Sequence, residues 1–310
     1  MEKIKILYLT GYGKSGATLI GRHLGSSEQA FFVGELKYFW NRGLVKNYEC
    51  TCGKKVDNCS FWKHVINEYL ESFPDIDREI ISKEFREFEK IKNYFNLKKI
   101  KENKGDEAYI QFLAKYLKHN EKLYEAIAKV SGKNILVDIS RIPGRLLALS
   151  FSDKFEIYPV YLMRDPRGVL NSFVQADMRY YGENRHSNLK QLVTWNANTF
   201  FSIKHIKNLS LGKFLFILYS DYVKNPDREL NQLHEILNGN WNSQMNNGKV
   251  SINLDPGHVF AGNRSRLVSG NVTISEDTKW RQQLSPVYKF LTTVISLPLY
   301  RYVVNRYHKN

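Results

Sequence analysis

The strongest constraint on the fold comes from the start of the chain, where an apolar segment runs into a glycine-rich turn. Residues 4–9 read Ile-Lys-Ile-Leu-Tyr-Leu, which is typical of a buried strand. The turn Gly-Tyr-Gly-Lys-Ser-Gly follows, and helix-forming residues continue from Thr18 to Leu24. Backbone N–H groups in such a turn, with the positive end of the helix dipole, attract anions. The stretch therefore predicts a site for a phosphate-like group.

The spacing of this loop differs from that of ATP- and GTP-hydrolysing proteins. Their pattern, Gly-x-x-x-x-Gly-Lys-Ser/Thr, would place a glycine at position 8, where this chain has Tyr8. Lys14, Ser15 and Thr18 still offer donors to a tetrahedral oxyanion. The alternative interpretation is a glycine turn that only connects strand to helix.

Apolar segments alternate with helical patterns along the rest of the chain. We expect strands at 31–34, 135–138, 157–163 and 213–219, and helices that begin near 143, 166, 189, 226 and 276. Residues 239–270 are rich in Asn, Gly and Ser and are expected to be loop. This alternation predicts an α/β fold, a single P-loop-like domain over residues 1–310 with a central, mostly parallel sheet flanked by helices.

Residues 61–134 interrupt this alternation. The segment is rich in Lys and Glu, and Ile81, Phe85, Phe88 and Phe95 fall at helical spacing. We expect a helical insertion that packs over the sheet through an aromatic face and acts as a substrate cap.

Candidate site residues follow the predicted strands, where ligands bind in parallel α/β sheets. Glu35 follows the second strand, Ser140 and Arg141 the third, and Arg164 the fourth. Ser172 lies eight residues after Arg164 (172 − 164 = 8), so the pair forms a possible second anion site. Two anion sites suit a nucleoside with a phosphate at each end. The alternative for Arg164 is a surface ion pair with Asp165.

The loop at residues 13–19 resembles the 5′-phosphosulfate loop of the sulfotransferase family, whose donor is 3′-phosphoadenosine-5′-phosphosulfate (PAPS). An Arg followed eight residues later by Ser is the family's 3′-phosphate motif. The segments at 138–143, 219–222 and 258–266, and the cysteine loop at 52–62, also have counterparts in bacterial-type members. The resemblance implies the following donor-binding residues: Gly13, Lys14, Ser15, Gly16, Ala17, Thr18, Leu19, Arg164, Ser172, Tyr219, Asn263 and Arg266.

The same resemblance assigns catalytic roles. Tyrosylprotein-type members use a Glu in a Gly-Glu pair as general base, and Gly34-Glu35 matches that pair. Lys14 and Arg141 would stabilise the charge on the leaving group. Three residues depart from the family pattern: Ala17 replaces a threonine, Ser220 replaces an acidic residue, and Arg141 replaces a lysine and cannot readily give up a proton. The resemblance implies PAPS as co-substrate, adenosine 3′,5′-bisphosphate as product, and no metal ion.

Charge and hydropathy limit the kinds of partner that the sequence allows. The net charge of +15 favours anionic ligands, although it could reflect only a solvated surface. The N-terminus has no signal-peptide pattern, and the apolar run at 290–304 is interrupted by Pro298 and Arg301, so we expect a cytoplasmic protein with at most peripheral membrane contact through that run.

The expected partner is an acceptor hydroxyl of a sugar, lipid, phenol or peptide, with no nucleic acid. Two rival functions are a small-molecule or nucleotide kinase and a non-catalytic polyanion-binding module.

Three cysteines do not make a disulfide framework. Cys50, Cys52 and Cys59 with His64 could bind zinc, but the paired Cys-x-x-Cys hallmark is missing. We expect free thiols or one labile disulfide. For His258 we expect a hydrogen-bonded structural role.

Overall fold

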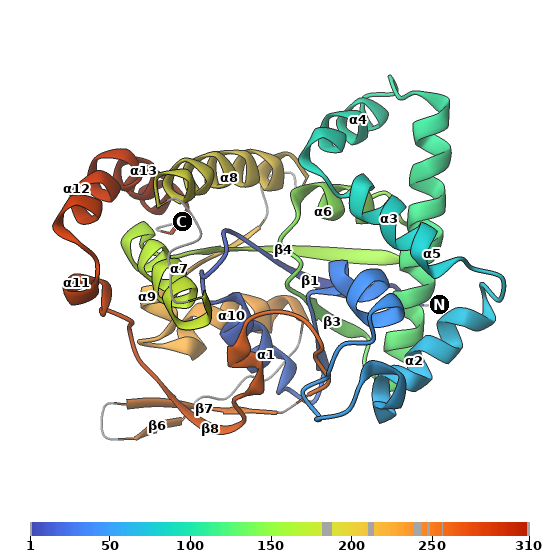
Figure 1. The fold of residues 1–310 in the computed structure, drawn as a ribbon, viewed down its shortest axis with the longest axis horizontal. Coiled ribbons are helices and arrows are strands. Elements are labelled where there is room, and N and C mark those ends of the chain that lie inside the picture. Colours follow the sequence, from blue (N-terminus) through green and yellow to red (C-terminus); the bar gives the residue numbers. More distant parts are fainter. Residues whose placement is uncertain are drawn as a thin grey trace.

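A computed structural model describes residues 2–181, 188–209, 214–237, 244–246, 249–255 and 257–308. Its centre is a sheet of five strands, all parallel, in the order β2-β3-β1-β4-β5 (Figure 1). The strands are β1 (Ile4–Thr10), β2 (Ala30–Gly34), β3 (Ile135–Asp138), β4 (Phe155–Met163) and β5 (Leu215–Leu218). The predicted α/β fold with a parallel sheet is therefore confirmed.

Strand β1 lies at the middle of the sheet and is buried on both faces. Ile6 and Tyr8 belong to the core on one face, and Leu7 and Leu9 to the core on the other. The chain passes from β1 to β2 and β3 on one side and later to β4 and β5 on the other side. The order reverses at β1, so the carboxyl ends of β1 and β4 border the crevice where such sheets bind ligands.

Helices cover both faces and the two ends of the sheet (Figure 1). The helices that follow or flank the sheet strands are α1 (Ala17–Gly25), α6 (Pro143–Leu149), α7 (Pro166–Tyr181), α8 (Asn188–Leu209), α9 (Tyr219–Tyr222) and α10 (Pro226–Leu237). The C-terminal region forms three helices rather than the single one expected near residue 276: α11 (Trp280–Gln283), α12 (Pro286–Ile295) and α13 (Leu297–Tyr307).

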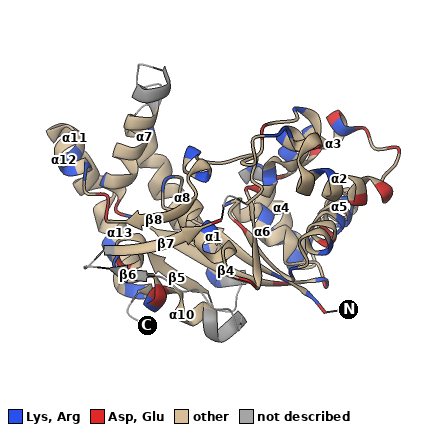
Figure 2. Ribbon diagram, turned by 90° about the horizontal axis from the view of Figure 1, so that it is seen from below, with Lys and Arg blue, Asp and Glu red and all other residues tan. Residues whose placement is uncertain are grey.

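The interruption between β2 and β3 is helical, as predicted. It comprises α2 (Ser60–Glu71), α3 (Arg78–Phe88), α4 (Ile91–Lys101) and α5 (Glu107–Ser131), and α5 contacts both β1 and α6. Basic and acidic residues both occur along α2, α3 and α5 (Figure 2), while Phe85 and Phe88 are buried. Phe95 was expected on the packed face but is 55% exposed.

A buried ionic network joins this insertion to the sheet. The guanidinium of Arg145, on α6, is fully buried and lies 3.0 Å from Glu89 and 3.5 Å from Asp138, which ends β3. It also donates to the hydroxyls of Tyr116 and Tyr124 on α5. Tyr124 in turn donates to Asp138 at 2.5 Å. Because every member has several partners, the insertion is positioned by directional bonds as well as by apolar packing.

The expectation of loop over residues 239–270 is wrong for residues 244–246 and 249–254, which are strands, and holds for 257–263; residues 239–243, 247–248 and 256 lie outside the described residues. The strands β6 (Gln244–Asn246) and β7 (Lys249–Leu254) form a second, antiparallel sheet with β8 (Gly270–Ile274). Val250, Ile252 and Leu254 alternate toward the core that also holds α1. This period-2 pattern was present in the sequence, but the surrounding Asn and Gly residues concealed it.

Among the described helices, none is both long enough and apolar enough to span a bilayer.

Candidate active site

The glycine loop after β1 leads into the N-terminus of α1, where the sequence predicts an anion site. Gly16 precedes the helix with φ +99°, a backbone conformation that L side chains rarely adopt. A Cβ on Gly16 would also lie 2.6 Å from the ring of Tyr219. Ser15 is buried, and its Oγ has no hydrogen-bond partner within the described chain. Such an orphaned donor is consistent with an anionic ligand at this loop.

Arg164 connects the end of β4 to this loop. Its Nη1 donates to the carbonyl of Lys14 at 2.9 Å and to Oγ of Ser172 at 3.2 Å. Its Nη2 lies 2.8 Å from the carboxylate of Asp277, and its guanidinium stacks over the ring of Tyr219 at 4.8 Å. The alternative of an ion pair with Asp165 is wrong, since Asp165 instead pairs with Arg167 at 2.6 Å.

The loop, Arg164 and the segment near residue 263 line one cavity of about 890 Å³. Most of the predicted donor-binding residues and both predicted catalytic cations contribute to its lining: Lys14, Gly16, Ala17, Thr18, Leu19, Arg141, Arg164, Ser172, Tyr219 and Asn263.

Three predicted donor-binding residues do not line this cavity. At Gly13, an added Cβ would meet the ring of Phe173 at 3.0 Å, and Ser15 is buried. Arg266 donates to the carbonyl of Gly262 at 3.2 Å, and Gly262 does line the cavity. Arg266 therefore contacts the cavity wall through this residue.

Glu35 lies buried behind Arg141, outside the cavity lining. One carboxylate oxygen is 2.8 Å from Arg141 Nη2, and the other is 3.0 Å from Lys37 Nζ. Burial alone would raise the pKa of Glu35, but the positive charges of Arg141 and Lys37 outweigh it and hold the pKa below its usual value. The carboxylate is therefore ionised, and it orients two cations at once.

Those two cations face different cavities. Arg141 lines the large cavity described above, whereas Lys37 lines a second cavity of about 390 Å³ between the segment 37–48 and helix α3. The walls of the second cavity are aromatic and basic, and include Tyr38, Trp40, Tyr48, Phe85, Arg42, Lys46, Arg86 and Lys90. Glu35 is thus placed between a cavity on the sheet and a cavity under the insertion.

Tyr8 makes structural hydrogen bonds from the position where a nucleotide-hydrolase loop would need glycine. Its hydroxyl donates to the carbonyl of Ile142 and accepts from the backbone N–H of the same residue, both at 3.0 Å. These bonds fix the turn that carries Arg141, whose φ is +60°. The side chain therefore holds a candidate catalytic cation in an unusual backbone conformation.

Sequence reasoning missed several residues of the site. Gln175 lies one helical turn beyond Ser172, so the i, i+3 spacing could have identified it. Lys37 was detectable as a cation two residues from Glu35. Asp277 and Lys279 come from a distant segment that nothing local connects to Arg164.

The cysteine loop also differs from expectation. His64 is exposed, and its Nδ1 lies 2.6 Å from the carbonyl of Ser60, one turn back along the chain. The histidine that meets the cysteines is His258.

A search of curated protein sequences finds no match to this chain. Among solved structures, the chain is similar to the sulfotransferase domain from the curacin biosynthetic pathway, at 15% identity and a TM-score of 0.47 over 95% of this chain and 97% of that one. It is also similar to the sulfotransferase domain from the Synechococcus PCC 7002 olefin synthase, at 16% identity and a TM-score of 0.47 over 94% of each chain.

A third similar structure is sulfotransferase STF9 from Mycobacterium avium, at 10% identity and a TM-score of 0.43 over 76% of this chain and 63% of that one. The decisive comparison is with a family model, because it covers most of the chain. The model described as the sulfotransferase family matches residues 7–243, from the first strand to beyond β5. The chain belongs to the sulfotransferase family.

Proposed function

We propose that this protein transfers the sulfonyl group of PAPS to an acceptor hydroxyl. The observation that carries the proposal is that two anion-binding elements on neighbouring strands line one cavity. Arg164 and Ser172 would hold the 3′-phosphate, and the backbone of residues 14–19 would hold the 5′-phosphosulfate. Charge-assisted bonds of this kind are the strong class of hydrogen bonds, which suits a donor with two separate anionic groups.

The reaction would be an in-line displacement at sulfur. The acceptor oxygen forms a bond to sulfur while the bond from sulfur to the bridging oxygen breaks. The electron pair of that bond stays on the bridging oxygen, so adenosine 3′,5′-bisphosphate leaves with an added negative charge. The acceptor loses its proton to a base. The protein must therefore stabilise an oxyanion and accept one proton.

Lys14 and Arg141 are the candidate cations at the bridging oxygen, because both line the donor cavity beside the loop. Arg141 would act through its positive charge and its fork of N–H donors, so its role would be electrostatic only. Glu35 is the candidate base. Its ion pairs keep it ionised and ready to accept, but they also make it a weak base. We infer that it takes the proton late, when the bond from the acceptor oxygen to sulfur has formed and negative charge has built up on the bridging oxygen.

The second cavity is the candidate acceptor site, with the insertion at 61–134 as its cap. Its lining combines aromatic rings with basic side chains, and its one carboxylate, Glu89, is already engaged by Arg145. Arg42 lies over the ring of Tyr38 at 3.9 Å, which keeps its charge beside an apolar surface. These features favour an acceptor that carries a flat apolar part and an anionic group, such as an anionic phenol, over a neutral sugar.

Isothermal titration with adenosine 3′,5′-bisphosphate tests the donor site. The wild type should bind it, and Arg164→Ala should weaken binding by at least tenfold. Arg228→Ala is the matched control, since it removes the same charge from an exposed position on α10. If the wild type does not bind the nucleotide, or if Arg164→Ala binds it equally well, the proposal fails. Activity with ATP and magnesium in place of PAPS would instead support the kinase alternative.

A screen of acceptor classes with labelled PAPS tests the second site. Anionic phenols should accept sulfonate faster than neutral sugars, and Arg42→Ala combined with Arg86→Ala should reduce that preference. A preference that survives this double substitution would place the acceptor elsewhere.

Peripheral membrane contact remains a separate prediction. Val287, Phe290 and Val294 lie on one exposed face of α12, with Phe290 67% exposed. Sedimentation with anionic vesicles, compared between wild type and Phe290→Ser, would test it.

A further inference from the structure

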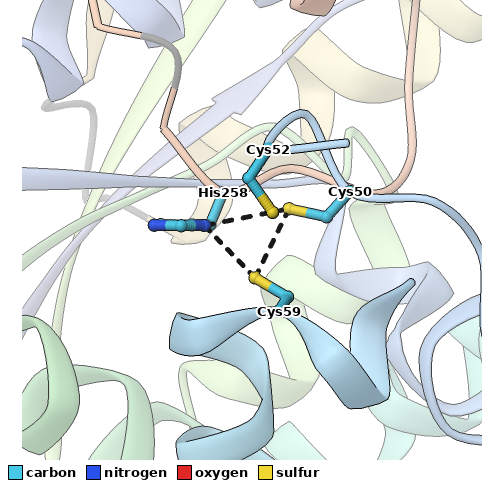
Figure 3. Close-up of side chains that lie close together, drawn as sticks. All are labelled: Cys50, Cys52, Cys59 and His258. Atoms are coloured by element: carbon cyan, nitrogen blue, oxygen red, sulfur yellow. Dashed lines mark hydrogen bonds between the residues drawn. The ribbon is translucent and has the colours of Figure 1, made fainter. Parts of the chain in front are cut away.

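Four side chains of types that can bind a metal converge from two distant parts of the chain (Figure 3). Cys50, Cys52 and Cys59 come from the loop between residue 50 and helix α2. His258 comes from the segment that follows β7, nearly 200 residues later. Their four ligand atoms all lie within 4.8 Å of one another. Only the three cysteines are close in sequence, so this cluster is a product of the fold.

The separations among the ligand atoms of Cys50, Cys59 and His258 are close to the edges of a tetrahedral zinc site, and the ligand atom of Cys52 lies within 4.8 Å of each of them. Sγ of Cys59 is 3.7 Å from Sγ of Cys50 and 3.2 Å from Nδ1 of His258, and Sγ of Cys50 is 3.9 Å from Nδ1 of His258. A zinc ion with bonds of about 2.3 Å to sulfur and about 2.0 Å to nitrogen separates its ligands by roughly 3.5–3.8 Å. A small inward or outward adjustment of each side chain would therefore admit the ion.

The donor set specifies the metal and its role. Three thiolates and one imidazole are soft and borderline ligands, which favour zinc over magnesium or calcium. Such a set fills all four tetrahedral positions and leaves none open for substrate, which is the property of structural rather than catalytic zinc. The ion would therefore take no part in sulfonyl transfer.

Hydrogen bonds around the cluster hold both ligand segments in place. The backbone N–H of Thr51 donates to the carbonyl of Val259 at 3.0 Å, and the hydroxyl of Thr51 donates to the carbonyl of Gly257 at 2.9 Å. The indole N–H of Trp62 donates to the carbonyl of His258 at 2.8 Å. The ring of Phe61 stacks on the imidazole with centroids 5.3 Å apart. Supporting contacts of this type orient metal ligands before the ion binds.

We propose that Cys50, Cys52, Cys59 and His258 bind one structural zinc ion. The ion clamps the segment after β7 onto the cysteine loop. Four residues after His258, Gly262 lies against Glu35, and Asn263 lines the donor cavity. Arg22 binds the carbonyl of Ser265 at 3.1 Å on the other side of this segment. The zinc clamp and Arg22 together hold a wall of the donor cavity from both ends.

Metal analysis of the purified full-length protein, produced with added zinc, tests the site. We expect about one zinc per chain in the wild type and less than a tenth of that in Cys59→Ser and His258→Ala. His64→Ala is the matched control, because His64 is the histidine nearest in sequence but lies outside the cluster. It should retain the full zinc content.

Two further measurements keep the test decisive if a variant fails to fold. His258→Cys replaces the imidazole with a fourth thiolate and should restore zinc binding relative to His258→Ala. Cobalt added to wild-type protein stripped of metal should give the absorption bands of tetrahedral thiolate coordination, and zinc should remove them. Wild type without zinc, unchanged zinc in Cys59→Ser, or a mass two daltons lower than that of the reduced chain, which indicates a disulfide, would each overturn the proposal.

Discussion

The Nη2 atom of Arg164 lies 2.8 Å from a carboxylate oxygen of Asp277, inside the cavity assigned to the donor. The carboxylate thus occupies one side of the guanidinium that would bind the 3′-phosphate. The negative charge of Asp277 opposes an incoming phosphate. Because the Asp277 side chain is one-third exposed, it can turn away from Arg164 when the phosphate binds. Donor binding would then exchange one charge-assisted pair for another.

Removing this competition should tighten nucleotide binding. Asp277→Asn keeps the shape of the side chain but removes its charge, so we expect adenosine 3′,5′-bisphosphate to bind on the order of tenfold more tightly, the equivalent of ~1.4 kcal/mol. Isothermal titration measures the change. Asp165→Asn removes the same charge from a carboxylate that pairs with Arg167, and it should leave affinity unchanged. Weaker binding by Asp277→Asn would mean that this carboxylate positions Arg164 instead of competing for it.

The pH dependence of turnover should report the ion pairs of Glu35. Arg141 and Lys37 lower its pKa, so the reactive carboxylate should persist to pH values below the usual glutamate pKa of about 4.3. The contribution of these ion pairs to the free energy of unfolding depends on pH in the same direction. It is complete above about pH 4.3 and is lost as pH falls through the lower pKa of the folded protein.

Lys37→Met removes one of the two cations that lower the pKa of Glu35. Burial, which raises that pKa, is then opposed by Arg141 alone. The pKa of Glu35 should rise, and the acidic limb of kcat/KM should move to higher pH. Lys46→Met, which takes an equal charge from the second cavity, should leave the limb in place. Glu35→Gln should lower kcat by about 10²–10⁴-fold while affinity for the bisphosphate is retained. If the acidic limb lies at the same pH in the wild type and in Lys37→Met, Glu35 is not the base.

The buried Arg145 network should contribute to holding the helical insertion against the sheet. Arg145→Met leaves Glu89 and Asp138 buried without their cation, and loss of one partner from such a network costs about 3–5 kcal/mol. Urea unfolding should show a correspondingly lower free energy of unfolding. Lys154→Met breaks an exposed pair with Glu125 and should cost no more than about 1 kcal/mol. Equal costs for the two substitutions would show that the network contributes little.

The positions of the five strands of the central sheet, and hence of the candidate site, could be predicted from sequence because they follow from local patterns. Strand β3 was predicted with the bounds it has, and Glu35, Arg141 and Arg164 lie at strand ends that share one edge of a parallel sheet. The sheet brings these residues together whatever the loops between them do.

What could not be predicted depends on contacts between distant segments. Asp277 and His258 acquire partners only when the chain after β7 folds back over the sheet, and no spacing rule relates them to Arg164 or Cys59. The choice of His64 as a zinc ligand relied on sequence proximity, whereas helix α2 directs that side chain to solvent. The position of Phe95 was wrong for a similar reason, since helical spacing identifies a face but not the neighbour that covers it.

The packing of Gly262 against Glu35 gives the sharpest test of the candidate base. Gly262 has φ +118°, and a Cβ there would lie 3.3 Å from Oε1 of Glu35. Gly262→Ala should displace that carboxylate by a few tenths of an ångström and lower kcat on the order of ten- to a hundredfold. Gly270→Ala is the control, because Gly270 also has a positive φ, +83°, but has no atom within 4 Å of the added Cβ. Both substitutions should lower stability by about 1–3 kcal/mol through backbone strain. Only Gly262→Ala should lose turnover, and an equal loss in Gly270→Ala would assign the effect to the segment as a whole.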